Sequence, residues 1–272
     1  MKKFLSLMLV AVLALSLAAC STGEPGTEGA TSYDNLDIAM ELTSEEYGIG
    51  FRKGSDLTAE VNKIMAELTE DGTLVKLAEK YELTLATSEP AEEEKATIKD
   101  IEEIKAKGKL VIGITDYQPM NYKDDKGEWT GFDTEFAQKV CEKLGVEAEF
   151  VEIEWDNKFI TLESKAIDCI WNGMTISDEV LKNTSCSKAY VKNAQVVVMA
   201  KDKISKYKDA KSMAKLTFAV EAGSAGASAA KDSGFKNIVE VAAQTDALLE
   251  VQSGACDACI IDLTMANATL GK

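Results

Sequence analysis

The sequence predicts an α/β fold made of two lobes that face each other across a cleft. Beyond residue 107, short apolar runs typical of buried strands alternate with amphipathic stretches of helical period. This alternation is typical of parallel sheets flanked by helices. Residues 159–175 and 247–264 also repeat one pattern: a helix, a turn with an aspartate, an apolar strand and a threonine. Two such strand ends that face each other would form a cleft. The residues that correspond are Asp168 with Asp257 and Thr175 with Thr264.

The elements can be placed in chain order from these patterns. Residues 31–43 predict a turn and an edge strand, and the glycine-punctuated run 46–54 predicts a second strand. Residues 55–81 form an amphipathic stretch that Gly72 divides into two helices. Residues 84–97 contain a proline and several glutamates without apolar period, which predicts a solvated linker. The rest predicts strand and loop (107–122), turn, helix and strand (127–153), helix, turn and strand (157–175), helix (177–183), strand (193–201), strand, turn and helix (215–232), and strand, helix, strand, helix (237–272).

The composition excludes several classes of function. The 272 residues are 46% hydrophobic, and 46 acidic against 30 basic residues give a formal charge of −16. Nucleic acid is therefore not an expected partner, because its phosphates are bound by clustered lysine and arginine. The chain has no histidine, which excludes histidine-based triads and zinc sites of the HExxH type. An enzyme would have to use carboxylates, lysine, tyrosine or cysteine, and no cofactor is expected.

The N-terminus has the pattern of an export signal. Lys2 and Lys3 precede an apolar stretch of about fifteen residues, which is short for a bilayer span of roughly twenty. The small residues before Cys20 resemble the lipobox of bacterial lipoproteins, in which the cysteine is lipidated. The resemblance implies a lipoprotein signal peptide over 1–19, a linker over 20–30, and a protein anchored at the extracytoplasmic face of the cell membrane. The alternative is an ordinary signal peptide that happens to contain a cysteine.

Five further cysteines follow, and Cys256 and Cys259 form a CxxC pair. This pair lies in an apolar run, and no second CxxC or histidine completes a metal site. We therefore expect buried small hydrophobic residues and no metal. The sequence leaves the thiol or disulfide state of the five cysteines open.

Residues 97–272 resemble the amino-acid-binding family (family 3) of ABC-transporter solute-binding proteins. The segments that carry the resemblance are KGKLVIGITDYQPMNYKDDKGEWTGFDTEFAQKVCEKLGV, AIDCIWNGMT, NAQVVVMAK, AVEAGSAG and ACDACIIDLT. The run ends before the family's last part, and residues 31–83 resemble that missing part. The resemblance therefore implies a two-lobe, periplasmic-binding-protein-like fold of type II that is circularly permuted. The alternative is a truncated chain with an unrelated N-terminal piece.

Permutation would divide the domains in a specific way. Lobe 1 would be continuous over 48–196, and lobe 2 would combine 31–43 with 200–272. The linker 84–97 would rejoin the family's original termini. Strands near Glu45–Phe51 and Gln195–Ala200 would cross between the lobes. The chain is expected to be a monomer, with a segment-swapped dimer left open.

Six residues are expected to bind the ligand, and four of them match the family's ligand-binding positions. The resemblance implies that Asp262 binds the ligand's ammonium, that the Gly173 carbonyl accepts from the same group, and that Thr175 binds the carboxylate. Ser224 opens a helix at a glycine-rich turn, which suits an anion. Tyr117 matches the aromatic residue that covers the ligand, and Trp171 is either a second wall or core. For Asp262 the alternative is a helix cap at the end of its strand.

One departure from the family affects the ligand. The arginine that usually binds the ligand carboxylate is replaced by Val180, and Arg52 is the only arginine in the chain. Either Lys182 and a helix N-terminus compensate, or the ligand is not a plain α-amino acid. Glu221 and Gln244, if they lie near the cleft, would favour a cationic or polar ligand.

The resemblance implies an extracytoplasmic protein that captures a small, polar, amine-bearing solute between its lobes and docks on ABC permease subunits. The first alternative is a ligand-sensing or degenerate lipoprotein on the same scaffold, without a transport role. A second is a dehydratase-like enzyme that would use Glu221 or Asp262 as acid or base. No nucleophile–base pair is evident for it.

Overall fold

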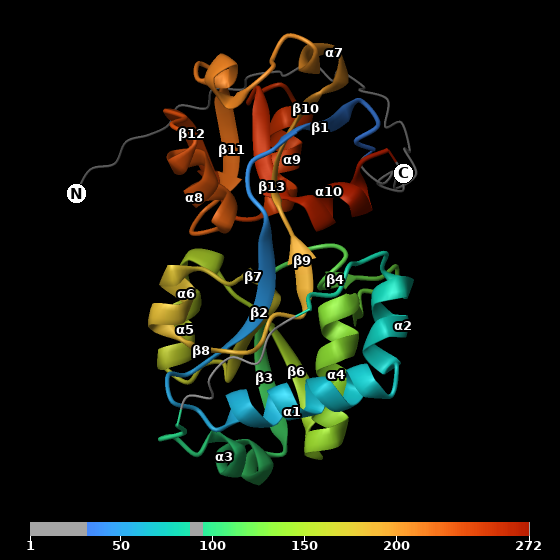
Figure 1. The fold of residues 1–272 in the computed structure, drawn as a ribbon, viewed down its shortest axis with the longest axis vertical. Coiled ribbons are helices and arrows are strands. Elements are labelled where there is room, and N and C mark those ends of the chain that lie inside the picture. The colour runs from blue at the N-terminus through green and yellow to red at the C-terminus, as the bar shows by residue number, and fades with distance from the viewer. Residues whose placement is uncertain (1–31, 88–94, 272) are drawn as a thin grey trace, which may run out of the picture. The chain divides into compact units, whose positions relative to one another are not determined.

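The computed structural model describes residues 32–87 and 95–271. The predicted signal peptide, the linker 20–30 and the lipidation site Cys20 lie outside the described residues. Two mixed sheets, each covered by helices, form two lobes (Figure 1). The two-lobe α/β prediction is thus confirmed for the described chain. No helix in the described ranges has both the length and the apolar character needed to cross a membrane.

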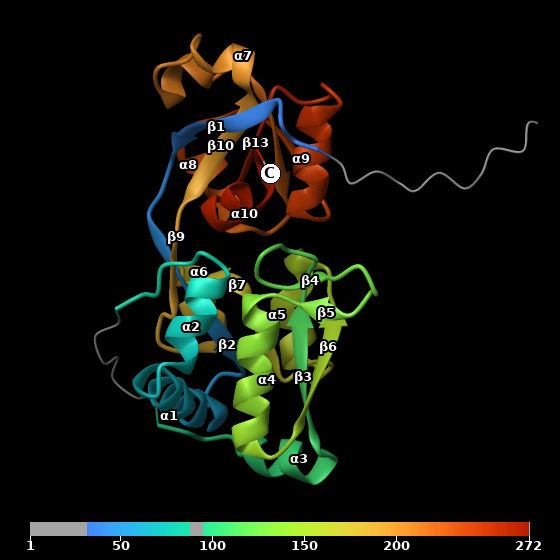
Figure 2. The ribbon, with the colours of Figure 1, turned by 90° about the vertical axis from the view of Figure 1, so that its right-hand side faces the viewer.

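Lobe 1 is built on a sheet with the strand order β6-β3-β7-β2-β8. In addition, β9 pairs with the first three residues of β2, 45–47. The strands β3, β6 and β7 run parallel, whereas β2 is antiparallel to β7. Figure 2 shows α1, α2 and α4 side by side against this lobe. The elements are β2 (Glu45–Phe51), α1 (Leu57–Glu70), α2 (Thr73–Lys80), α3 (Asp100–Lys107), β3 (Lys109–Ile114), the β4–β5 hairpin (Tyr122–Lys123, Trp129–Thr130), α4 (Phe132–Leu144), β6 (Glu147–Glu152), α5 (Lys158–Glu163), β7 (Cys169–Thr175), α6 (Asp178–Asn183), β8 (Ser185–Cys186) and β9 (Val191–Asn193).

Lobe 2 is built on a sheet with the strand order β1-β10-β13-β11-β12. The strands β11, β12 and β13 are parallel, and β10 joins them to the edge strand β1 through antiparallel ladders. Helices α8, α9 and α10 pack on this sheet. The elements are β1 (Leu36–Glu41), β10 (Gln195–Ala200), α7 (Lys201–Ile204), β11 (Thr217–Glu221), α8 (Ala225–Asp232), β12 (Asn237–Val241), α9 (Gln244–Gln252), β13 (Ala258–Asp262) and α10 (Leu263–Thr269).

The first part of the described chain contributes one strand to each lobe. β1 lies at the edge of the lobe 2 sheet, and β2 lies inside the lobe 1 sheet between β7 and β8. The prediction that Glu45–Phe51 and Gln195–Ala200 cross between the lobes needs correction, because each of these strands pairs within a single sheet. The chain passes between the sheets at 42–44 and at 194 instead.

The predicted helix break at Gly72 is confirmed. α1 ends at Glu70, and Gly72 has a φ of 77°, a left-handed conformation that glycine adopts without steric cost. α1 buries Leu57, Val61, Ile64, Met65 and Leu68, the residues that recur at helical spacing. The spacing of the apolar residues in the sequence therefore correctly predicts which face of this helix packs against the core.

The described parts of the predicted linker are exposed or half-buried, and they are also hydrogen-bonded to lobe 1. Leu85 forms a bridge with Val191, and the Ala86 N–H donates to the Tyr190 carbonyl at 3.0 Å. At the other end, the Thr97 N–H donates to the Gly54 carbonyl at 2.8 Å. These backbone bonds do not depend on side-chain character, so the polar composition gave no sign of them.

The internal repeat has the same backbone geometry in both lobes. Asp168 donates its N–H to the Val111 carbonyl at 2.7 Å, and its carboxylate accepts from the Val111 N–H at 2.8 Å. Asp257 makes both contacts with Thr217, each at 3.0 Å. Each aspartate therefore ties the start of one parallel strand to the start of the next, which fixes the carboxyl end of both strands in its lobe.

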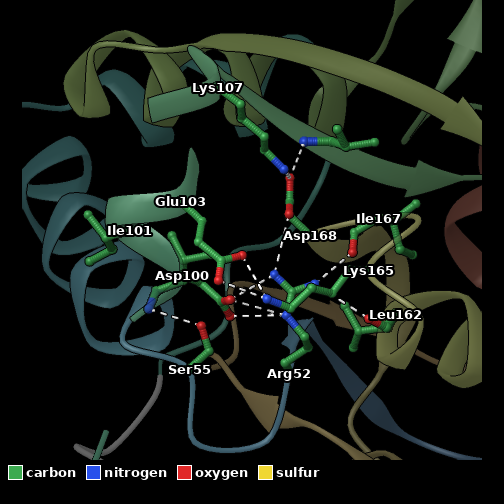
Figure 3. Close-up of polar contacts among 12 residues, drawn as sticks. Arg52, Ser55, Asp100, Ile101, Glu103, Lys107, Leu162, Lys165, Ile167 and Asp168 are labelled. Carbon is green, nitrogen blue, oxygen red and sulfur yellow. Dashed lines mark hydrogen bonds and ion pairs between the residues drawn. The ribbon is translucent and has the colours of Figure 1, made fainter. Parts of the chain in front are cut away.

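A buried ion cluster holds β2 in lobe 1 (Figure 3). Arg52 directly follows β2, and its guanidinium contacts Asp100 at 2.9 Å and Asp168 at 3.3 Å. It also donates to the Ile167 carbonyl at 2.8 Å, while Lys107 pairs with the second oxygen of Asp168 at 2.5 Å. Arg52, Asp100 and Asp168 are 7%, 1% and 4% exposed, so each carboxylate depends on its cationic partner.

We expect Arg52→Met to destabilise the protein by about 3–5 kcal/mol, because it leaves two carboxylates buried without their common partner. Urea denaturation measures this change. The control is Lys99→Met, which breaks the exposed Lys99–Glu102 pair and should cost less than about 1 kcal/mol. Equal losses in the two variants would contradict a structural role for the cluster.

Candidate functional site

A cleft of about 190 Å³ lies between the two lobes. This volume is below the roughly 300–1,000 Å³ of sites for drug-sized ligands, so the cleft suits a small solute. Its charged lining residues are Glu45, Lys158, Glu179, Glu221, Asp232 and Asp262; the others are Thr43, Trp155, Asn172, Gly173, Met174, Thr175, Ser177, Val180, Gly223, Ser224, Ala225, Ser228, Ala229 and Gln244. Five carboxyl groups against one ammonium favour a ligand with a positive charge.

Two further hollows, of about 500 and 460 Å³, are larger than the cleft. One lies along α2 and α10, and the other lies beside α1. Neither is lined by a buried carboxyl or ammonium group. The inter-lobe cleft is therefore the better candidate, because buried ionisable groups converge there.

Asp262 is the centre of an amide network at the cleft. It ends β13, and its carboxylate accepts from Asn193 at 2.5 Å, from Gln195 at 2.7 Å and from Gln244. The Gln244 side chain also accepts from the Asp262 N–H at 2.9 Å, which fixes its orientation. Burial and the nearby Glu45 carboxylate raise the pKa of Asp262, while the amide donors oppose that rise.

Thr175 ends β7 on the opposite lobe, and its hydroxyl donates to Glu45 at 2.7 Å. The same Glu45 oxygen accepts from Asn193 at 2.7 Å and from Gln195 at 2.8 Å. Asn193 and Gln195 thus bridge Glu45 to Asp262, so that the ends of β7 and β13 are joined through one polar network. Thr175 and Asp262 both line the cleft, so the structure places them at one shared gap, as the sequence predicts.

Glu221 ends β11 and lines the cleft with 4% of its surface exposed. One of its carboxyl oxygens is buried and has no hydrogen-bond partner among the described residues. Burial raises the pKa of Glu221 to about 8, the Asp262 carboxylate adds to this rise, and Lys158 opposes it. Such a carboxyl group is suited to an incoming donor.

Gly173 and Ser224 also lie at the cleft. The Gly173 N–H donates to the buried Asp133 carboxylate at 2.6 Å, and Gly173 has a φ of 54°. A Cβ at this position would lie 2.6 Å from the Tyr117 ring, so only glycine fits. Ser224 is the N-cap of α8, and its hydroxyl accepts from the Ala227 N–H at 3.1 Å.

Tyr117 and Trp171, the two predicted walls, do not line the cleft. The Tyr117 hydroxyl contacts the hydroxyl groups of Tyr47 and Thr264, each at 2.5 Å, and the residue is 1% exposed. Trp171 is fully buried and packs edge-to-face on Phe136 at 4.9 Å. The sequence predicts that Trp171 is either a second wall of the site or a core residue, and the structure shows that it is a core residue.

Val180 lines the cleft and packs with an apolar cluster in lobe 1. Its N–H is capped by the Ser177 hydroxyl at 3.3 Å, at the start of α6. Lys182, predicted as a compensating cation, is exposed and does not line the cleft. Instead the structure brings Lys158 there, from the first turn of α5.

Sequence reasoning missed Glu45 and Lys158, which line the cleft. It also missed Asn193 and Gln195, which bond to Glu45 and Asp262 behind it. Asn193 and Gln195 stand at the beginning of the apolar run NAQVVVMA, and these polar positions were the one signal that could have marked them. Lys158 looks like an ordinary lysine on an amphipathic helix. Nothing local distinguishes it, because its burial comes from contact with the other lobe.

The fold and the cleft define a two-lobe solute-binding protein, and comparisons with known proteins agree. Residues 110–268 match the family model of bacterial extracellular solute-binding proteins, family 3. The chain belongs to this family. That membership places it among binding proteins and gives the dehydratase-like alternative no support.

Relatives with described ligands share parts of the chain. The L-cystine-binding protein TcyJ of Escherichia coli K12 is 40% identical over 91 residues, which are 33% of this chain and 34% of the relative. The arginine-binding extracellular protein ArtP of Bacillus subtilis is 32% identical over 167 residues, 59% of this chain and 64% of ArtP. The chain thus spans about a third of TcyJ and under two thirds of ArtP.

Two solved structures are similar as well. Truncated, arginine-bound ArgBP from T. maritima superimposes with a TM-score of 0.59 at 33% identity, covering 61% of this chain and 79% of that protein. An ABC uptake transporter substrate-binding protein from Streptococcus pneumoniae with bound histidine gives 0.57 at 31% identity, covering 61% and 70%.

The Glu221 carboxyl group should make stability depend on pH. Between its ordinary pKa of 4.5 and about 8, only the folded chain keeps this proton, so the free energy of unfolding falls as pH rises through this window. The side chain of Glu221→Gln is neutral at every pH, so this variant should lose less of its free energy of unfolding as pH rises. Its stability relative to the wild type should rise by about 2 kcal/mol or more from pH 4.5 to pH 9, since one pKa unit corresponds to about 1.4 kcal/mol. Urea denaturation at both pH values measures this.

Glu179→Gln is the matched control, because Glu179 lines the same cleft but is exposed. Its pH profile should stay parallel to that of the wild type. A parallel profile for Glu221→Gln would contradict the retention of a proton by Glu221.

Proposed function

We propose that this protein is the extracytoplasmic solute-binding protein of an ABC importer and captures an amino acid with a cationic side chain between its lobes. The observation that carries the proposal is the cleft itself: in a chain of this family, a buried Asp262 at a strand end faces Thr175 across a gap whose charged lining residues are five acids and one lysine. An ammonium held by Asp262 and a second cation near Glu221 would supply the missing positive charge.

The relatives support the solute class. Those reported above are described as binding arginine, histidine or cystine. Five carboxyl groups in the cleft favour arginine or histidinium over cystine, whose two ammonium groups are balanced by two carboxylates. The permease subunits of the importer are proposed as partners on the same ground, since the Streptococcus relative is described as part of an ABC uptake transporter.

The test is a titration of the purified protein with L-arginine, L-histidine and L-cystine, followed by calorimetry and thermal shift. A ligand at 100 times its Kd should stabilise the folded state by about 2.7 kcal/mol. Asp262→Asn should weaken binding roughly 30-fold or more, because an ammonium loses its buried charged partner. Asp202→Asn, at an exposed position of α7 in the same lobe and outside the cleft, should bind as the wild type does.

Absence of a response to all three amino acids in the wild type would contradict the proposal. An unchanged affinity in Asp262→Asn would contradict the assignment of the ammonium site.

We also propose that the chain is a circular permutant of its family. The family model begins at residue 110, yet β1 and β2 lie before that point and complete both sheets. A protein in the ordinary family order would have these strands at its end. The predicted linker 84–97 would then join ends that are free in relatives of ordinary order.

A rearranged chain tests this directly: residues 95–272 first, followed without a break by residues 31–87. It should fold with the same circular dichroism and bind the same ligand within about threefold, because all contacts are kept. A chain of residues 95–272 alone should fail to fold, since it lacks β2 and Arg52. Failure of the rearranged chain to fold would contradict the permutation.

The lipid anchor at Cys20 is proposed from the lipobox-like sequence alone. It would place the protein at the extracytoplasmic face of the cell membrane, beside its permease. Mass spectrometry of the membrane-derived protein should find a lipidated Cys20 as its first residue, and an unmodified cysteine would contradict the anchor.

A further inference from the structure

Lys158 is the one cationic side chain among the described residues that line the cleft. It stands in the first turn of α5 in lobe 1, and only 5% of it is exposed. Its ammonium donates to the Gly223 carbonyl of lobe 2 at 2.9 Å and to the Trp155 carbonyl at 3.3 Å. It therefore lies where the two lobes meet at the cleft.

The charge on Lys158 has no counter-ion in the part of the chain that the structure describes. Within residues 32–87 and 95–271, no carboxylate lies within 4.0 Å of its ammonium, which contacts two carbonyls and the rings of Trp155 and Phe159. Buried lysines are almost always paired, because an unpaired charge loses its hydration without compensation. Burial accordingly lowers the pKa of Lys158. Two of its three N–H groups are used, so one is available to an acceptor.

The acidic groups that act on Lys158 do not pair with it. Glu179, Glu221 and Asp156 favour its charged form only from a distance. Glu221 has a buried oxygen without a partner and lines the same cleft. A buried cation and a buried acid that face one cleft without pairing are complementary to a ligand with both charges.

The position of Val180 strengthens this point. Val180 has an apolar side chain that cannot bind a carboxylate, and Lys182 is exposed and is not among the residues that line the cleft. Of the groups that can take a carboxylate with charge assistance, the described cleft therefore offers the Lys158 ammonium.

We propose that Lys158 is the carboxylate-binding residue of this cleft and that it selects amino acids over the corresponding amines. This inference rests on the proposed function, since it assumes an amino-acid ligand. When the carboxylate binds, it takes the free N–H of Lys158 and provides the missing counter-ion. Because Lys158 also contacts Gly223, the same contact links the ligand to both lobes.

The experiment compares three pairs of probes that differ only in the carboxylate: L-arginine with agmatine, L-histidine with histamine, and L-cystine with cystamine. Each is titrated by calorimetry into the full protein and into Lys158→Met. In the wild type, the amino acid that binds should do so roughly 10- to 100-fold more tightly than its amine, as expected for a charge-assisted contact. In Lys158→Met the amino acid should lose this advantage, while the amine should bind within about threefold of its wild-type affinity.

Two variants make the result specific. Lys158→Arg keeps the charge and should retain at least part of the preference for the amino acid. Lys182→Met removes an exposed lysine of α6 and should leave all affinities unchanged. Unchanged binding of the amine by Lys158→Met also shows that this variant is folded. If Lys158→Met does not fold, the same titrations are made with Lys158→Gln, whose side chain keeps a polar end.

Three results would overturn the inference. The first is that Lys158→Met loses affinity for the amino acid and for the amine equally, and the second is that it loses affinity for neither. The third is that the wild type binds the amino acid and the amine equally tightly. In each of these the wild type still binds, so the proposed function stands. A wild type that binds none of the six probes refutes the proposed function, and the role of Lys158 with it.

Discussion

The placement of one strand, β2, determines most of this structure. It lies between β7 and β8, although more than a hundred residues of sequence separate it from both. Glu45 at its beginning belongs to the polar network of the cleft, and Arg52 just after its end belongs to the buried ion cluster. The same strand thus connects the ligand-facing edge of lobe 1 with its base. Without it, β7 would keep only its pairing with β3, and both charge networks would lose a member.

The two charge networks follow the same physical rule with opposite results. In the cluster around Arg52, the buried charges contact one another, so the desolvation of each is offset within the protein. In the cleft, Lys158 and Glu221 are buried without ion pairs in the described chain. The first arrangement stabilises a fold. The second leaves an ammonium and a carboxyl group without partners at a place that a small molecule can reach, and this is a property of binding sites.

Much of the architecture could be predicted from residue patterns. The apolar period of α1, the break at Gly72 and the strand–helix alternation of residues 107–272 depend on neighbours within a few positions, and all appear in the structure. The sequence also placed Asp262, Thr175, Gly173 and Ser224 at the cleft that they line, since each lies at or near the end of a strand or at the start of a helix. Tyr117 and Trp171 are aromatic, and an aromatic residue in or after a strand suits a core as well as the wall of a site. Only the packing around them decides between the two.

The sequence by itself determined the fold class, the two lobes and the acidic character of the protein, because periodicity, turn residues and net charge are local or additive properties. The tertiary structure decided which charges meet. That Asn193 and Gln195 join Glu45 to Asp262, that residues 84–86 attach to β9, and that Lys158 is buried against Gly223 are consequences of chain segments far apart in sequence. Such contacts depend on the distance and dielectric surroundings of the two groups, which no single segment encodes.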